Sequence, residues 1–129
     1  MEKWKKDYLK ELLSDYPKMD DYFLERRGKL LLSPREKSSA IDPQEADKKR
    51  LISISLDRQL INLERNQKII ARCLEDASSE TNEIIRQLYM SQSKKKNLDL
   101  VADQVFLSKR QVIRLRDAFF EELAAHLGL

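Results

Sequence analysis

The stretch from residue 98 to residue 123, LDLVADQVFLSKRQVIRLRDAFFEEL, constrains the fold more than any other part of the chain. Ser108 precedes a run with helical periodicity, and Gln111 follows three residues later, which is the spacing of a capping box. A helix is therefore predicted to begin at this point. Its core-facing stripe recurs every three or four residues and consists of Val112, Leu115, Phe119 and Leu123.

A shorter apolar-periodic segment precedes this helix, with Leu98, Val101, Ala102 and Val105 on one face. The small side chain of Ala102 allows a second helix to approach closely, as two helices that cross at a steep angle require. The two segments are therefore predicted to form a helix-turn-helix. The second helix would be its recognition helix, held so that it can enter a major groove.

Positive charge is concentrated in the same region, although the net charge of the whole chain is only +3. Residues 94–116 hold seven Lys or Arg against two Asp, a net charge of +5, which leaves −2 for the rest. A local cationic surface of this kind favours a polyanion as partner. The predicted contacts to double-stranded DNA are Lys94, Lys95, Lys96, Ser108, Lys109, Arg110, Gln111, Arg114 and Arg116. The alternative is that Lys94–Lys96 form a solvated turn and that the other cations form only the solvent-exposed face of a helix.

The chain contains two glycines and three prolines, while 36% of its residues are charged, which predicts an all-α fold almost without strands. Residues 1–32 are predicted to form an N-terminal helical pair, with a first helix over about residues 2–15 and an interruption at Pro17. Residues 33–46 carry the other two prolines and are expected to be a linker. Residues 47–77 would form a long helix for association, and residues 78–129 the helix-turn-helix domain, whose first helix Ser78 or Ser79 would cap.

The long helix carries a coiled-coil-like seam spaced alternately by four and three residues, with one polar residue in it. At 1.5 Å per residue the helix would be about 45 Å long, so its seam needs a partner. That partner is either the N-terminal helical pair or a second chain, and the polar seam residue favours a homodimer. A plain core-facing stripe is the alternative. The residues of the predicted dimer seam are Leu56, Leu60, Leu63, Gln67, Ile70 and Leu74.

Enzymatic functions find little support in the sequence. The chain has no Gly-rich phosphate loop and no nucleophile with a base at a recognisable spacing. Cys73 is the only cysteine and His126 the only histidine, so neither a disulfide within the chain nor a metal site is expected. No apolar run is long enough to span a bilayer. We therefore expect a cytoplasmic protein without catalytic residues, cofactor, metal or membrane association.

Residues 79–123 resemble region 4 of the sigma-70 class, the part of a sigma factor that reads the upstream promoter element. The resemblance lies in Ile84, Ile85, Leu88, Tyr89, Val101, Ala102 and the run Leu107-Ser108-Lys109-Arg110-Gln111-Val112. The motif often has glycine where this chain has Phe106, which predicts a more open turn and a tilted recognition helix.

The chain as a whole resembles the ArpU/RinA-like regulators of phages and prophages of Gram-positive bacteria. The matching segments are Asp15-Tyr16-Pro17, Glu25-Arg26-Arg27, Leu63-Glu64-Arg65, Cys73-Leu74-Glu75, Leu107 to Arg110, Phe119-Phe120 and Leu127-Gly128. The resemblance implies a sequence-specific DNA-binding regulator of late gene transcription that acts with host RNA polymerase. The alternatives are a protein like a small terminase subunit, which packages DNA, and a helical protein-protein interaction module without DNA binding.

Overall fold

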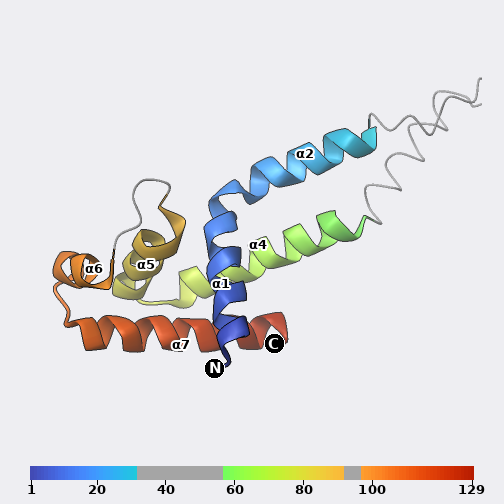
Figure 1. Cartoon of the computed structure of the whole chain (residues 1–129). Helices are drawn as coiled ribbons and strands as arrows, with labels where there is room; N and C mark the ends of the chain where they lie inside the picture. The colour runs from blue at the N-terminus through green and yellow to red at the C-terminus, as the bar shows by residue number, and fades with distance from the viewer. Residues whose placement is uncertain (32–56, 92–96) are drawn as a thin grey trace, which may run out of the picture. The chain divides into compact units, whose positions relative to one another are not determined.

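The computed structural model describes residues 1–31, 57–91 and 97–129, and the described residues are almost entirely helical, with no strand among them (Figure 1). The predicted all-α class is therefore confirmed. The helices are α1 (Lys3–Asp15), α2 (Met19–Leu31), α4 (Arg58–Asp76), α5 (Ser79–Ile85), α6 (Leu98–Val105) and α7 (Lys109–Leu127). A 3-10 turn (Tyr16–Lys18) joins α1 to α2, and a π-helical segment, η3 (Arg86–Met90), directly continues α5.

The described chain divides into two compact units, one made of residues 1–17 and 67–129 and the other of residues 18–66. Helix α4 contributes to both units. The predicted N-terminal helices agree closely with α1 and α2, and Pro17 lies in the 3-10 turn between them. The predicted linker, residues 33–46, and the start of the predicted long helix, including Leu56, lie outside the described residues.

The first unit is organised around the C-terminal helix α7, against which α1, α5 and α6 pack. Helix α7 buries Val112, Phe119, Phe120 and Leu123. Helix α1 also packs against η3, and its buried side chains are Leu9, Leu12 and Leu13. Helices α1 and α7 therefore both bury apolar side chains within this unit, as amphipathic helices require.

The seam of α4 is largely buried within one chain. Leu60 and Leu74 are each 3% exposed and Ile70 is fully buried, whereas Leu63 and Gln67 are half-buried. Leu60, Ile70 and Leu74 are thus core residues, as in the alternative of a plain core-facing stripe. A dimer built on this seam would first have to expose these three residues, so their burial gives no reason to expect a second chain. The homodimer itself stays a prediction.

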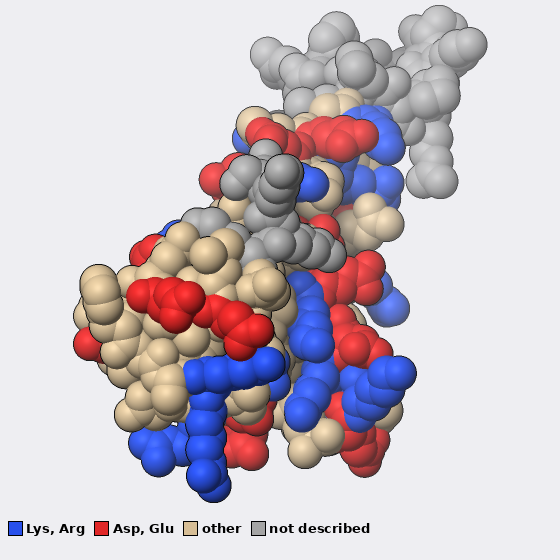
Figure 2. All heavy atoms as spheres, turned by 60° about the vertical axis from the view of Figure 1, so that its left-hand side comes forward, with Lys and Arg blue, Asp and Glu red and all other residues tan. Residues whose placement is uncertain are grey.

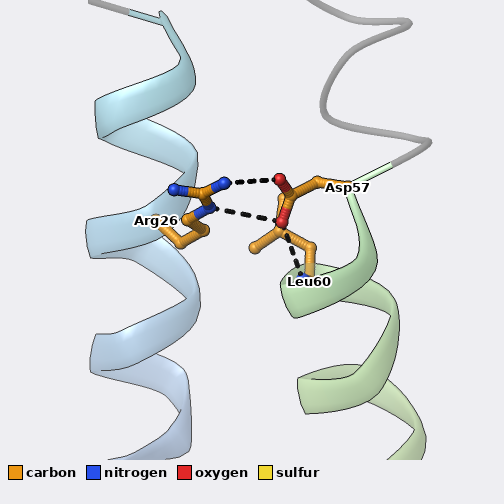
Figure 3. A network of polar contacts seen from close by, with 3 residues as sticks. All are labelled: Arg26, Asp57 and Leu60. Carbon is orange, nitrogen blue, oxygen red and sulfur yellow. Dashed lines mark hydrogen bonds and ion pairs between the residues drawn. The ribbon is translucent and has the colours of Figure 1, made fainter.

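A polar contact joins α2 to the start of α4 in the second unit (Figure 3). Asp57 precedes α4 and caps it, because its Oδ1 accepts a hydrogen bond from the Leu60 backbone N–H at 3.1 Å. Arg26 donates through Nη2 to Oδ2 at 2.8 Å and through Nε to Oδ1 at 3.3 Å. The Arg26 hydrogen bonds lower the pKa of Asp57 below its ordinary value of 3.8.

This contact makes the packing of α2 against α4 sensitive to acid. A carboxylate with a lowered pKa stabilises the fold at pH values above its ordinary pKa, and that contribution is lost as the pH falls through the lower, folded-state pKa. We expect Asp57→Asn, which can still cap α4 but cannot titrate, to lose less helical stability than the wild type between about pH 5 and pH 2. Thermal melting followed by circular dichroism measures this, and superimposable acid profiles for the two proteins would contradict it.

Candidate nucleic-acid interface

Helices α5, α6 and α7 pack around one small core. Ile84 from α5, Val101 and Ala102 from α6, and Val112 from α7 are each at most 5% exposed and pack together. The half-buried residues around them are Leu88, Leu98, Val105, Leu107 and Leu115. Val112 and Leu115 thus lie on the core side of α7, as their spacing predicts. The opposite side of α7 is left to polar and charged residues.

Side-chain caps fix the start of each helix of this domain. The Ser108 hydroxyl accepts from the Gln111 N–H at 3.2 Å, and the Gln111 Oε1 accepts from the Ser108 N–H at 3.0 Å, which confirms the predicted capping box. Ser78 is the cap of α5. Asn97 caps α6 by accepting from the Leu100 N–H at 2.8 Å, a role that its position just before an apolar-periodic segment could have indicated. Ser108 and Gln111 are exposed, and the Ser108 hydroxyl and the Gln111 Oε1 already serve the cap.

The turn between α6 and α7 is closed rather than open. The Leu107 N–H donates to the Ala102 carbonyl at 3.1 Å and the Phe106 N–H to the Asp103 carbonyl at 3.4 Å, the two bonds of a Schellman motif. Phe106 itself adopts the left-handed conformation, with φ of 58°, that this motif requires. The expectation of a more open turn without glycine is therefore wrong, because phenylalanine takes the glycine conformation here.

Three of the predicted cations are exposed on the N-terminal half of α7: Lys109, Arg110 and Arg114. Arg110 and Arg114 are four residues apart and share a helix face. Neither forms an ion pair with another described residue, whereas the Lys109 Nζ lies 3.5 Å from the Asp99 Oδ1 at the start of α6. Figure 2 turns the end of the molecule with α6 and the start of α7 forward, and shows Lys and Arg side chains projecting there beside acidic ones.

Arg116 differs from these three cations, since its side chain is only 16% exposed. It follows Val112 by four residues and therefore lies towards the core side of the helix. Its guanidinium group pairs with Asp117 at 3.0 Å and lies 5.9 Å from the centre of the Phe120 ring. The ring of Tyr89 contacts Phe120, with a centroid distance of 5.5 Å. These contacts give Arg116 a packing role, so the structure does not favour it as a DNA contact.

The remaining expectations from the sequence concern the three lysines at 94–96, Cys73, a metal site and a membrane span. Lys94, Lys95 and Lys96 lie outside the described residues. Cys73 is 1% exposed, and burial raises the pKa of its thiol to about 11, so the thiol is protonated at neutral pH and poorly reactive.

The described residues contain no group of three His, Cys, Asp or Glu side chains that could hold a metal ion. Within the described ranges, no helix combines the length and apolar character that crossing a bilayer requires.

A separate groove of about 520 Å³ lies between α2 and α4 in the second unit. Its cations are already paired, Arg26 with Asp57 and Lys29 with Glu25 at 3.7 Å. The groove is lined by Tyr22, Glu25, Arg26, Lys29, Gln59, Asn62, Leu63 and Asn66. The exposed arginines of α7, which have no ion-pair partner among the described residues, are therefore the better candidates for an anionic partner.

Comparison with known proteins gives no match to a protein family, to a curated protein or to a solved structure.

Proposed function

We propose that this chain is a sequence-specific DNA-binding protein and that α7 is its recognition helix. The observation that carries the proposal is the division of α7 into two faces at its N-terminal end. Val112 anchors one face in the core, while Arg110 and Arg114 project from the other without an acidic partner among the described residues. Arginine can donate two hydrogen bonds to the O6 and N7 atoms of guanine, so these two residues are suited to reading base edges.

The neighbouring groups suit contacts to the DNA backbone. Lys109 lies at the first turn of α7, where it can reach a phosphate once it leaves Asp99. The capped N-terminus of α7 adds a partial positive charge at the same end. Lys94–Lys96 come just before Asn97, the cap of α6, in the sequence and would add phosphate attraction without a fixed geometry.

Our proposal extends to regulation of phage or prophage late transcription together with host RNA polymerase. This part rests on the resemblance of the sequence to ArpU/RinA-like regulators and to sigma-70 region 4. A homodimer would present two recognition helices to half-sites about 34 Å apart, one turn of the duplex.

Selection of bound fragments from a random duplex pool tests the proposal. We expect the full chain to enrich fragments with a common short motif, whose retention falls as salt is raised. Retention without any enrichment would contradict sequence-specific binding. Absence of salt-dependent retention would instead indicate a protein-protein interaction module, and a ring-sized mass in solution would indicate a protein like a small terminase subunit.

A further inference from the structure

Phe106, in the turn of the helix-turn-helix, combines two unfavourable features. It is the only non-glycine residue with positive φ among the described residues, and the residue is 93% exposed. The left-handed conformation is costly for a residue with a Cβ atom, and an exposed phenylalanine gains nothing from burial. Phe106 therefore makes little contribution to the stability of the fold through its side chain.

The end of α7 offers a direct comparison within the same chain. There the Leu129 N–H donates to the Ala124 carbonyl at 2.9 Å and the Gly128 N–H to the Ala125 carbonyl at 3.2 Å, the same Schellman pattern as at the end of α6. The left-handed residue at that position is Gly128, with φ of 78°. Glycine thus suffices for this turn, and it adopts the conformation without steric cost.

The hydrophobic contact that accompanies such a turn is also supplied without Phe106. Leu107, the next residue, packs against the cluster that contains Ala102. The phenylalanine ring is consequently left outside the core, next to a capped helix end. Lys109 and Arg110 follow it by three and four residues and are exposed. An anionic surface that approaches these cations must come close to the ring.

We propose that Phe106 is a DNA-contact residue, whose ring packs against a deoxyribose or a thymine methyl group at the edge of the groove that α7 enters. This inference rests on the proposed function. The surroundings favour DNA over a protein partner, because protein-docking patches gather several apolar residues, and the residues that follow the turn, Ser108 to Arg110, are polar and cationic. Apolar contact with thymine methyl groups is a recognised element of groove readout.

The test uses the opposite effects that a contact residue of this kind should have on stability and on binding. We expect Phe106→Gly to raise the melting temperature by roughly 2–6 °C, because it relieves the left-handed conformation. The same variant should bind the duplex selected by the wild type about three- to tenfold more weakly. A merely structural residue would change both quantities in the same direction, or would leave binding unchanged.

Two further measurements sharpen the result. Phe106→Leu keeps an apolar side chain and should retain most of the affinity, whereas Phe106→Asn tolerates the left-handed conformation and should bind as weakly as Phe106→Gly. Replacing thymine by uracil in the selected duplex should abolish the difference between wild type and Phe106→Gly if the ring contacts a methyl group, and preserve it if the ring contacts deoxyribose.

The outcomes separate this inference from the function on which it rests. If the wild type binds the selected duplex and Phe106→Gly binds it equally well, the inference is wrong while the proposed function stands. Lower stability together with weaker binding in Phe106→Gly would also overturn it, since the ring would then be a structural element. If the wild type binds no duplex, the proposed function fails and the inference fails with it.

Discussion

Val112→Asp should strongly destabilise the packing of α5, α6 and α7. Val112 is fully buried, packs against Ile84, Val101 and Ala102, and has no cation in this cluster that could pair with a carboxylate. An unpaired buried charge costs about 3–5 kcal/mol, which is a large part of the roughly 5–15 kcal/mol that stabilises a typical domain. Thermal or denaturant unfolding followed by circular dichroism should show a free energy of unfolding that is lower than that of the wild type by about this amount.

Ala118→Asp is the matched control, because Ala118 lies on the same helix and is exposed. The same new carboxylate there should change the free energy of unfolding by no more than about 0.5 kcal/mol. If Val112→Asp were as stable as Ala118→Asp, the orientation of α7 would be wrong, and the assignment of its exposed face would fall with it.

Arg110→Ala and Arg114→Ala should each weaken binding to the selected duplex by about 1–3 kcal/mol, because each removes a donor pair to a base edge. Binding to random duplex should change far less, since each variant removes only the attraction of a single charge to the phosphates. Titration of both duplexes across a salt series measures the two effects. Equal reductions in affinity for selected and random duplex would exclude these arginines from base readout.

Arg72→Ala provides the charge-matched control for these variants. Arg72 lies on α4, outside the segment of residues 98–123, is exposed, and pairs weakly with Asp76 at 4.0 Å. We expect its removal to leave the preference for the selected duplex intact.

Removal of Lys94, Lys95 and Lys96 together should lower affinity for both duplexes alike, with the salt slope reduced by roughly 0.9 for each phosphate that these lysines neutralise in the wild type.

The features that depend on local sequence could be predicted. The apolar stripe of α7 has a helical period, so Val112 and Leu115 could be placed on the core side without knowing what they touch. The capping box of Ser108 and Gln111 lies within four residues and needs no tertiary context. The all-α class follows from the scarcity of glycine and proline together with these periodicities.

The features that depend on residues far apart in the sequence could not be predicted. Whether the α4 seam faces its own chain or another depends on packing that periodicity does not encode, and Leu60, Ile70 and Leu74 are buried within one chain. In the sequence Arg116 is one more cation of a basic helix, and its packing role is evident only once Tyr89 and Phe120 lie beside it. The conformation of Phe106 could not be predicted either, because propensity favours glycine at a left-handed position.

The central claim, that α7 reads a base sequence, is tested most directly by the affinity of the wild-type chain for the selected duplex and for a shuffled duplex of the same composition, at physiological salt. We predict that the selected duplex binds at least about a thousandfold more tightly, the lower end of the range for specific DNA-binding proteins. Equal affinity for the two duplexes would contradict the claim.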